Sequence, residues 1–255
     1  MAREWRLIVD GAVDGAMNMG IDEALLESVA NGGPPTLRIY RWDRPTVSLG
    51  RFQRLADVAP AVRAREGVPV VRRPTGGRGV LHGREVTYSV AATVHDGVPR
   101  GTAASYAHLC EGLTSAFRLL GVPAELTRRD RGARSGACYL HATRADLSLG
   151  AAKLSGSAQV WRRDAVLQHG SVVIERDVAL EAALFRLDGP AEARLAVAAV
   201  GLAEVLGETP GPEQVERALV EGFGAGLGVA FTPGELTADE RERAARRAVD
   251  AACDV

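Results

Sequence analysis

The segment from residue 68 to residue 82, VPVVRRPTGGRGVLH, constrains the fold of this chain more than any other. Two apolar runs, both rich in valine, flank a loop that contains Pro74, Gly76, Gly77 and Gly79. β-Branched runs interrupted by glycine and proline are typical of a strand, a loop and a second strand. Because glycine has no Cβ, the backbone N–H groups of such a loop can come close to a ligand. The segment therefore predicts a strand–loop–strand unit that can hold an anion or a carbonyl group.

The charged side chains around this loop favour a binding role. Arg72, Arg73 and Arg78 add fixed positive charge, and His82 follows the loop. The alternative is a tight hairpin with solvated arginines, which is the usual meaning of an isolated Gly-Gly pair. The loop is not a P-loop, because no Gly-Lys-Ser/Thr follows, and it is not a Gly-x-Gly-x-x-Gly motif. We therefore expect a ligand loop of another kind.

Composition excludes several classes of protein. The 255 residues carry a formal net charge of −1, which argues against nucleic-acid binding. No apolar stretch is long enough to span a membrane and the N-terminus lacks a signal-peptide pattern, so we expect a cytoplasmic protein. The three cysteines and five histidines are scattered, which predicts neither disulfides nor a metal site. With 46% hydrophobic residues, the chain can form one domain over residues 1–255 with a sizeable core.

Hydrophobic periodicity and turn residues predict strands in the first two thirds of the chain, with helices between and after them. Strands are expected at residues 5–9, 36–40, 46–50, 86–94 with one largely buried side, 137–141, 146–149, 150–160, and 165–175 as a pair. Helices are expected at residues 16–30, 56–66, 103–120, 179–185, 191–206, 213–223 and 238–252. The glycines of residues 222–228 are interpreted as a helix end before a strand at 229–231. The pattern predicts an α/β domain built on a mixed sheet.

Cys138 and Lys153 are the candidate catalytic residues. Cys138 lies outside any helical apolar stripe, unlike Cys110, which the stripe of residues 103–120 predicts to be a buried structural thiol. Lys153 lies among small neutral residues, which is unusual for a solvated lysine. A nearby ammonium group stabilises a thiolate, and a thiolate can attack a thioester and hold the acyl group. The sequence leaves open whether Cys138 meets Lys153 or His141, although an offset of three places His141 on the opposite face of a strand.

Other residues allow two interpretations. His82 and His169 each stand next to a glycine, and either could orient a substrate carbonyl or be a satisfied structural histidine. The small residues at 150–160 indicate close approach of a ligand or of another backbone. Residues 127–136 are rich in arginine and predict a polar loop that an acidic partner could contact. Cys253, at the end of the last helix, is expected to be exposed and without a role.

Several motifs, in the right order, resemble those of the lipoate–protein ligase and octanoyltransferase family. RRPTGGRGVLH, at residues 72–82, is similar to the signature loop of that family. KLSGSAQ, at residues 153–159, followed by LQHGS, at residues 167–171, resembles its second signature, whose lysine is essential. NMGIDEALL and RWDRPTVSLGRFQ match its N-terminal segments, and GELTADE resembles its C-terminal ending. The similarity extends over residues 5–240.

Within this family, the chain is most similar to the LipM-type octanoyltransferases. Arg78 stands where ATP-dependent ligases typically have a third glycine, and Cys138 precedes Lys153 by fifteen positions, as in that type. Ala152 and the triplet that begins at His141 depart from the usual residues, which bears on substrate specificity more than on chemistry. The resemblance implies a class II synthetase-like fold, the biotin/lipoate ligase catalytic domain, with a mixed sheet and flanking helices.

The resemblance also implies an activity. An octanoyl group would pass from octanoyl-acyl carrier protein to Cys138, and then to a lysine of a lipoyl-domain protein such as glycine cleavage H protein. Lys153 would stabilise the thiolate and later deprotonate the incoming amine. No metal or ATP is implied, because the thioester is already activated. The residues expected to bind substrate are Arg72, Thr75, Gly76, Gly77, Arg78, His82, Gly156, Ser157, Ala158, His169 and Gly170.

Three alternatives remain open from the sequence. The chain could move octanoyl groups between lipoyl-domain proteins with the same cysteine. It could be an ATP-dependent lipoate ligase, in which Lys153 contacts an acyl-adenylate and Cys138 has no role. It could also be a non-catalytic module that sequesters acyl groups, although the intact Cys138 and Lys153 argue against this. For the octanoyltransferase activity, a surface of Arg128, Arg129, Arg131 and Arg134 is a candidate docking site for an acidic carrier protein.

Overall fold

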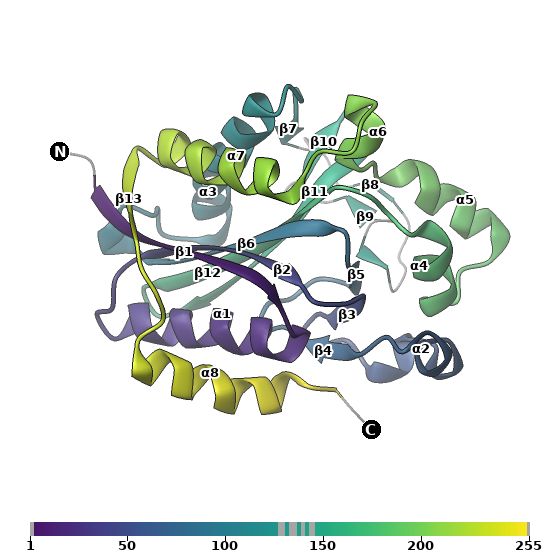
Figure 1. Cartoon of the computed structure of the whole chain (residues 1–255), viewed down its shortest axis with the longest axis horizontal. Coiled ribbons are helices and arrows are strands. Elements are labelled where there is room, and N and C mark those ends of the chain that lie inside the picture. Colours follow the sequence, from purple (N-terminus) through teal and green to yellow (C-terminus); the bar gives the residue numbers. More distant parts are fainter. Residues whose placement is uncertain (1–2, 127–130, 133–136, 139–140, 143–145, 254–255) are drawn as a thin grey trace.

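The computed structural model describes residues 3–126, 131–132, 137–138, 141–142 and 146–253 (Figure 1). Its centre is an eight-stranded sheet. In spatial order the strands are β13 (Val229–Pro233), β1 (Arg3–Val13), β2 (Thr36–Trp42), β6 (Glu85–Thr93), β12 (Ala165–Val173), β11 (Ala152–Arg162), β10 (Leu147–Leu149) and β7 (Glu125–Leu126). β13, β1 and β2 are parallel, and all neighbours from β2 to β7 are antiparallel. The prediction of a mixed sheet is confirmed.

Two pairs of helices cover the two faces of this sheet (Figure 1). α1 (Gly15–Ala30) and α8 (Ala238–Ala251) lie side by side on one face, and α3 (Thr102–Leu119) and α7 (Pro212–Leu227) lie on the other. A separate cluster of buried apolar side chains lies beneath each pair. Strand β6 is therefore buried along both faces, whereas one largely buried side was predicted.

A second sheet, of three strands, carries the glycine-rich loop. Its strands are, in order, β4 (Val70–Arg72), β3 (Thr46–Leu49) and β5 (Val80–His82), so the loop joins β4 to β5 as the strand–loop–strand pattern predicts. The helix expected at residues 56–66 is divided into the short turn η1 (Leu55–Asp57) and α2 (Pro60–Glu66). The division falls at a proline that occupies the first turn of α2, where its missing N–H costs nothing.

The remaining elements are short. Turn η2 (Val94–Asp96) follows β6, and β8 (Arg131–Gly132) pairs with β9 (His141–Ala142). After β12 come α4 (Val178–Leu184), α5 (Gly189–Ala198) and α6 (Leu202–Leu206), so the single helix expected at residues 191–206 is two helices. Most of the arginine-rich loop at 127–136, together with the docking surface predicted there, lies outside the described residues.

Helix α7 ends at Leu227 rather than at residue 223, because its glycines serve helix packing. A Cβ on Gly222 would lie 2.4 Å from the backbone nitrogen of Ala116 in α3, and one on Gly226 would lie 2.6 Å from that of Gly112. Without side chains at these positions, α3 and α7 can approach closely. The glycines of this segment are therefore part of a helix–helix contact, and only Gly228, with φ of 64°, ends the helix.

Two other predictions are wrong in detail, and one is confirmed. The expected pair at residues 165–175 is a single strand, β12, over residues 165–173; at Gly170 a Cβ would lie 2.5 Å from the Ser157 hydroxyl oxygen of the neighbouring strand β11. Cys253 is half-buried against apolar side chains rather than exposed. Cys110 is buried, as its place in the stripe of α3 predicts.

Candidate active site

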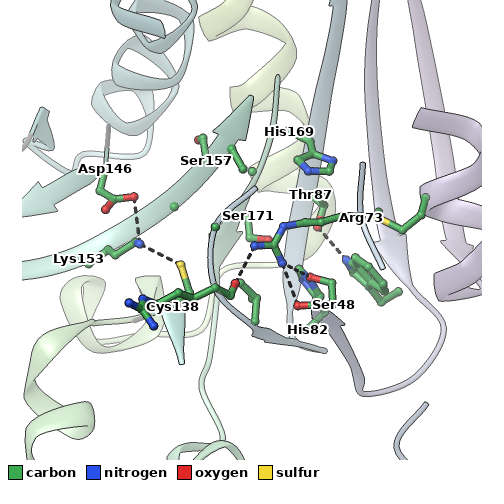
Figure 2. A pocket seen from close by; sticks show the side chains of 18 of the residues that line it. Ser48, Arg73, His82, Thr87, Cys138, Asp146, Lys153, Ser157, His169 and Ser171 are labelled. Carbon is green, nitrogen blue, oxygen red and sulfur yellow. Dashed lines mark hydrogen bonds and ion pairs between the residues drawn. The ribbon is translucent and has the colours of Figure 1, made fainter. Parts of the chain in front are cut away.

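A cavity of about 200 Å³ opens between the glycine-rich loop and strands β11 and β12 (Figure 2). Cys138, Lys153 and Asp146 lie on one side of it, and Ser48 and His82 lie on the other (Figure 2). Residues of α1, β2, β3 and β6 complete the wall, so segments far apart in the sequence meet here. A cavity with a few convergent polar groups and a nucleophile is the usual form of an active site.

Cys138, Lys153 and Asp146 form a continuous chain of contacts. The Lys153 Nζ lies 3.4 Å from the Cys138 Sγ and 3.0 Å from Asp146 Oδ1. Lys153 and Asp146 are buried, with side-chain exposures of 1% and 3%, whereas Cys138 is half-buried. The structure thus brings Cys138 next to Lys153, the meeting that spacing left open. An ammonium group at this distance favours the thiolate form of a cysteine, which is its nucleophilic form.

The charges around Lys153 keep it protonated in spite of its burial. Burial alone would lower the pKa of Lys153, but the charge of Cys138 and then that of Asp146 outweigh it and raise the pKa above the ordinary value. A buried ammonium without such partners would lose its proton. The site therefore holds the Lys153 ammonium between the Cys138 sulfur and the Asp146 carboxylate.

The position of Lys153 depends on Gly156. A Cβ at Gly156 would lie 2.8 Å from Lys153 Cε and 2.9 Å from its Nζ, so Gly156→Ala must displace the ammonium group. We expect the alkylation of Cys138 by iodoacetamide near pH 7 to slow by about tenfold, because a thiolate without its counter-ion is less populated. The rate is measured by peptide mapping, with Gly189→Ala, where a Cβ meets nothing within 4 Å, as the matched control. Equal rates for the two variants would contradict a role of the Lys153 ammonium in activating Cys138.

The glycine-rich loop also holds the segment that carries Cys138. The backbone N–H of Cys138 donates to the carbonyl oxygen of Gly79 at 2.8 Å, and Ala137 pairs with Gly79 as a parallel bridge. Ala137 and Cys138 therefore run beside the glycine-rich loop and pair with it at Gly79. They do not form part of a longer strand as expected for residues 137–141. The loop therefore positions the Cys138 thiol, and β11 positions the Lys153 ammonium group.

Arg73 organises this loop from inside. Its guanidinium donates to the carbonyl oxygens of Ser48, Gly76 and Arg78, at 2.8, 3.1 and 2.6 Å, and also to the Ser48 hydroxyl at 2.9 Å. Arg73 is only 6% exposed, so these contacts replace its hydration. A planar donor fork that binds several carbonyls fixes the curvature of a loop more firmly than glycine and proline alone.

His82 belongs to a buried polar network on the wall of the cavity. Its Nδ1 lies 2.6 Å from Glu85 Oε1 and its Nε2 lies 2.7 Å from the Ser48 hydroxyl. The ring stacks on Trp42, with centroids 3.9 Å apart. The hydroxyls of Thr87 and Ser171 donate to the same Glu85 oxygen, at 3.0 and 2.6 Å. These contacts fix the imidazole, which is the behaviour of a satisfied structural histidine facing a site.

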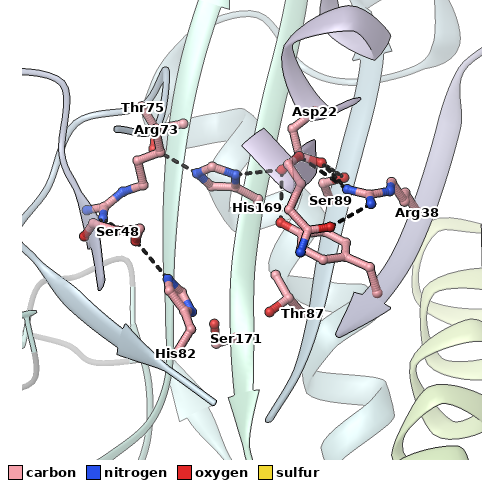
Figure 3. Close-up of polar contacts among 12 residues, drawn as sticks. Asp22, Arg38, Ser48, Arg73, Thr75, His82, Thr87, Ser89, His169 and Ser171 are labelled. Atoms are coloured by element: carbon pink, nitrogen blue, oxygen red, sulfur yellow. Dashed lines mark hydrogen bonds and ion pairs between the residues drawn. The ribbon is translucent and has the colours of Figure 1, made fainter. Parts of the chain in front are cut away.

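His169 is fixed by a second carboxylate, that of Asp22 (Figure 3). Asp22 Oδ2 lies 2.8 Å from His169 Nδ1, and the other ring nitrogen lies 2.8 Å from the Thr75 hydroxyl. Because an ionised carboxylate only accepts hydrogen bonds, Nδ1 of His169 carries the proton. Arg38, Ser89 and Tyr40 also donate to Asp22, at 3.1, 2.7 and 3.0 Å. Through Asp22, this buried hydrogen-bond network connects α1 with β2, β6 and β12 next to the cavity.

Asp22→Asn is expected to lower the free energy of unfolding by about 3 kcal/mol near neutral pH, because it breaks a fully buried ion pair with Arg38. Burial by itself raises the pKa of Asp22. The hydrogen bond from His169 and the charge of Arg38 together outweigh burial, so the pKa of Asp22 lies below its ordinary value. The stabilisation is therefore present above the unfolded-state value of about 3.9 and is lost as pH falls through the folded-state pKa. Denaturant titrations of both proteins from pH 7 to pH 2 should show their difference shrinking below about pH 4. A difference independent of pH would contradict this assignment.

Most of the residues predicted to bind substrate line the cavity. These are Gly77, Arg78, His82, Gly156, Ser157, Ala158, His169 and Gly170. Thr75 does not line the cavity, but its hydroxyl forms a hydrogen bond with His169 Nε2 and so helps to orient that ring. Gly76 accepts from Arg73 through its carbonyl oxygen, outside the lining. Arg72 does not line the cavity: its Nη1 binds the carbonyl oxygens of residues 50, 51 and 53, at 3.2, 3.3 and 2.6 Å.

Sequence reasoning missed several lining residues. Asp146, Arg73, Ser48, Trp42 and Met19 all face the cavity. Asp146 lies in a segment whose pattern predicts an ordinary short strand. Ser48 and Trp42 belong to no recognisable functional motif. Arg73 had a signal, because it belongs to the Arg72–Arg73 pair before the loop. Successive side chains point to opposite faces of a strand, so only one of the two arginines could face the site.

The fold defined by these elements is that of the lipoate–protein ligases. A putative lipoate protein ligase of T. acidophilum with bound lipoic acid superposes with a TM-score of 0.78, at 22% identity, over 95% of this chain and 94% of the other. A lipoate-protein ligase A bound with ATP gives a TM-score of 0.80, at 23% identity, over 96% and 94%. The expected fold class, the biotin/lipoate ligase catalytic domain, is confirmed.

Sequence comparison identifies the family within this fold class. The model of the lipoyl protein ligase A/B catalytic domain matches residues 14–224. Octanoyltransferase LipM of Kyrpidia tusciae is 41% identical over 94% of this chain and 93% of its own length. Octanoyltransferase LipM of Symbiobacterium thermophilum is 40% identical over 100% and 98%. The chain belongs to the lipoyl protein ligase A/B catalytic-domain family, and it is an acyltransferase.

The described residues lack two other kinds of feature, a metal-binding cluster and a membrane-spanning helix. Among them, no group of three or more His, Cys, Asp or Glu side chains is arranged to hold a metal ion. No helix within the same residues combines the length and apolar character needed to cross a bilayer.

Proposed function

We propose that the chain transfers an octanoyl group from octanoyl-acyl carrier protein to a lysine of a lipoyl-domain protein, through a thioester on Cys138. The observation that carries this proposal is the contact of 3.4 Å between Lys153 Nζ and Cys138 Sγ on the wall of the cavity. The names of the LipM relatives support octanoyl as the acyl group. An activated cysteine fits an acyl group that arrives as a thioester, because sulfur replaces sulfur and no other source of energy is required.

In the first half-reaction, the Cys138 thiolate attacks the carbonyl carbon of the donor thioester. A new carbon–sulfur bond forms to Cys138, and the carbon–sulfur bond to the carrier breaks. The leaving carrier thiolate takes a proton from the Lys153 ammonium, which lies beside Cys138. The products are an octanoyl thioester on Cys138, a neutral Lys153 amine and the free carrier thiol.

Acylation prepares Lys153 for the second half-reaction. The charge of Cys138 is the strongest of the influences that raise the pKa of Lys153, and acylation removes that charge. The neutral Lys153 then takes one proton from the ammonium group of the acceptor lysine. The acceptor amine attacks the thioester carbon, Cys138 leaves as a thiolate, and the amide nitrogen releases its second proton to solvent. The resting ion pair of Cys138 and Lys153 is restored.

The glycine-rich loop and β11 supply the rest of the site in this proposal. Gly77, Arg78, Gly156 and Ser157 border the cavity next to Cys138 and Lys153. Backbone N–H groups from these two segments would stabilise the oxyanion of the tetrahedral intermediates. Arg73 would keep the loop in the required curvature, because it binds the carbonyls of Gly76 and Arg78.

Intact-mass measurement of the wild-type protein tests this function. After mixing with octanoyl-acyl carrier protein without ATP, we expect the mass of one octanoyl group on the enzyme. Peptide mapping should place it on Cys138, and neutral hydroxylamine should release it, because hydroxylamine cleaves thioesters and not amides. Unmodified glycine cleavage H protein should discharge the same group. Labelling that appears only with a free acid and Mg-ATP would overturn the proposal in favour of an ATP-dependent ligase.

A further inference from the structure

The turn of residues 50–54, which follows β3, presents a large aromatic side chain to solvent. Of the large hydrophobic side chains exposed in the described part of the chain, Phe52 is the most exposed, at 87%. Arg51 and Arg54 flank it, and both are exposed. The Arg51 guanidinium lies 5.9 Å from the centroid of the Phe52 ring. An exposed aromatic between two arginines is the composition of a protein-binding hot spot.

This turn is held rigidly, although its apex touches little else. Arg72 Nη1 binds three of its carbonyl oxygens, those of Gly50, Arg51 and Gln53, at 3.2, 3.3 and 2.6 Å. The Gly50 N–H donates to the side chain of Gln53 at 3.1 Å. A guanidinium committed to one turn fixes the direction in which Phe52 points. Such preorganisation lowers the entropy lost when a partner binds.

The turn also forms the outer side of the catalytic loop. The Arg51 N–H donates to the carbonyl oxygen of Thr75 at 2.9 Å. A Cβ on Gly50 would lie 2.1 Å from the carbonyl oxygen of Gly77, so the two backbones are in direct contact there. Gly77 and Arg78 line the cavity. Phe52 and its two arginines therefore belong to a turn that packs directly against the loop lining the cavity that holds Cys138.

From this placement we propose that Arg51, Phe52 and Arg54 form the docking surface for the lipoyl-domain acceptor. The inference rests on the proposed function and adds the site of partner binding. The acceptor must bring the four-carbon stem of a lysine to Cys138, so its body has to sit directly at the rim. An acyl carrier delivers its group on a long prosthetic arm and can dock farther away. The two arginines favour an acceptor surface that carries carboxylates around an apolar depression.

Direct binding tests the docking surface without relying on catalysis. The probe is unmodified glycine cleavage H protein with a fluorescent label, titrated with the full-length enzyme. We expect Phe52→Ala, and separately the pair Arg51→Glu with Arg54→Glu, to raise the Kd by about tenfold or more. Val249→Ala removes a side chain that is 77% exposed on α8 and serves as the matched control, with no expected change. Equal Kd values for wild type and both docking variants would overturn the proposal.

Two loading reactions separate the possible partners. Loading of Cys138 from octanoyl-pantetheine, a small donor, should proceed at the wild-type rate in the Phe52 variant, which shows an intact site. If the variant loses loading from octanoyl-acyl carrier protein but binds H protein normally, the surface serves the donor and the proposal is wrong. If the wild type never forms the Cys138 thioester, the proposed chemistry fails, while the H protein titration still decides the docking question.

Discussion

Replacing Cys138 with alanine is expected to lower the rate of octanoyl transfer by about 10⁴-fold or more, because no covalent intermediate can then form. The cavity wall should survive, since Cys138 is half-buried and its backbone contact to Gly79 does not involve the thiol. The measurement is a single-turnover transfer from octanoyl-acyl carrier protein to H protein, followed by mass spectrometry of the acceptor. The unfolding transition of the variant should match that of the wild type.

Cys253 supplies the control for this experiment. It is the other half-buried cysteine, and it packs near the C-terminus against the cluster that includes Val70. Cys253→Ala should leave the transfer rate unchanged. Undiminished transfer by Cys138→Ala would refute the thioester mechanism and leave Lys153 as the chemically important residue.

Lys153→Met should have two separate effects. It removes the cation beside Cys138, so we expect acylation to slow by about 10³-fold. It also leaves the Asp146 carboxylate buried without its ammonium partner, which should cost about 3 kcal/mol of unfolding free energy. The two effects are measured by intact-mass kinetics and by urea denaturation of the same protein.

A double variant separates chemistry from stability. In Lys153→Met with Asp146→Asn, the carboxylate charge is also removed, so most of the lost unfolding free energy should return. The acylation rate should remain low, because no cation has been restored. Recovery of the rate together with the stability would mean that Lys153 acts only as a structural residue.

The sequence predicted where helices and strands occur better than where they end or break. The sequence located α1, α3 and α8 and the longer strands of the central sheet closely. Helices α3 and α8 have an amphipathic pattern, whereas β6 and β12 are buried along their length. Glycines misled the prediction at the end of α7, because the glycines after residue 221 suggested that the helix stops there. Gly222 and Gly226 instead admit the backbone of α3, which lies far away in the sequence.

The site residues that could be predicted are those whose neighbours in the sequence are unusual for their residue type. Cys138 and Lys153 were singled out because each stands in unusual surroundings, and the structure places them in contact. The partners of the histidines could not be found in this way, since Asp22 and His169 are 147 positions apart. The choice between Arg72 and Arg73 depends on strand register, which the hydrophobic pattern of a three-residue strand does not determine.

The attachment of Cys138 has a consequence for how such enzymes can diversify. Lys153, His169 and Arg73 belong to the sheets or to the loop they support, whereas the cysteine arrives on a separate segment that is joined to Gly79 by a backbone hydrogen bond. That bond is independent of the side chain at position 138. Under the proposed mechanism, a lineage can therefore exchange the residue at position 138 without rebuilding the cavity, so that binding an acyl group and forming a thioester with it can change separately in evolution.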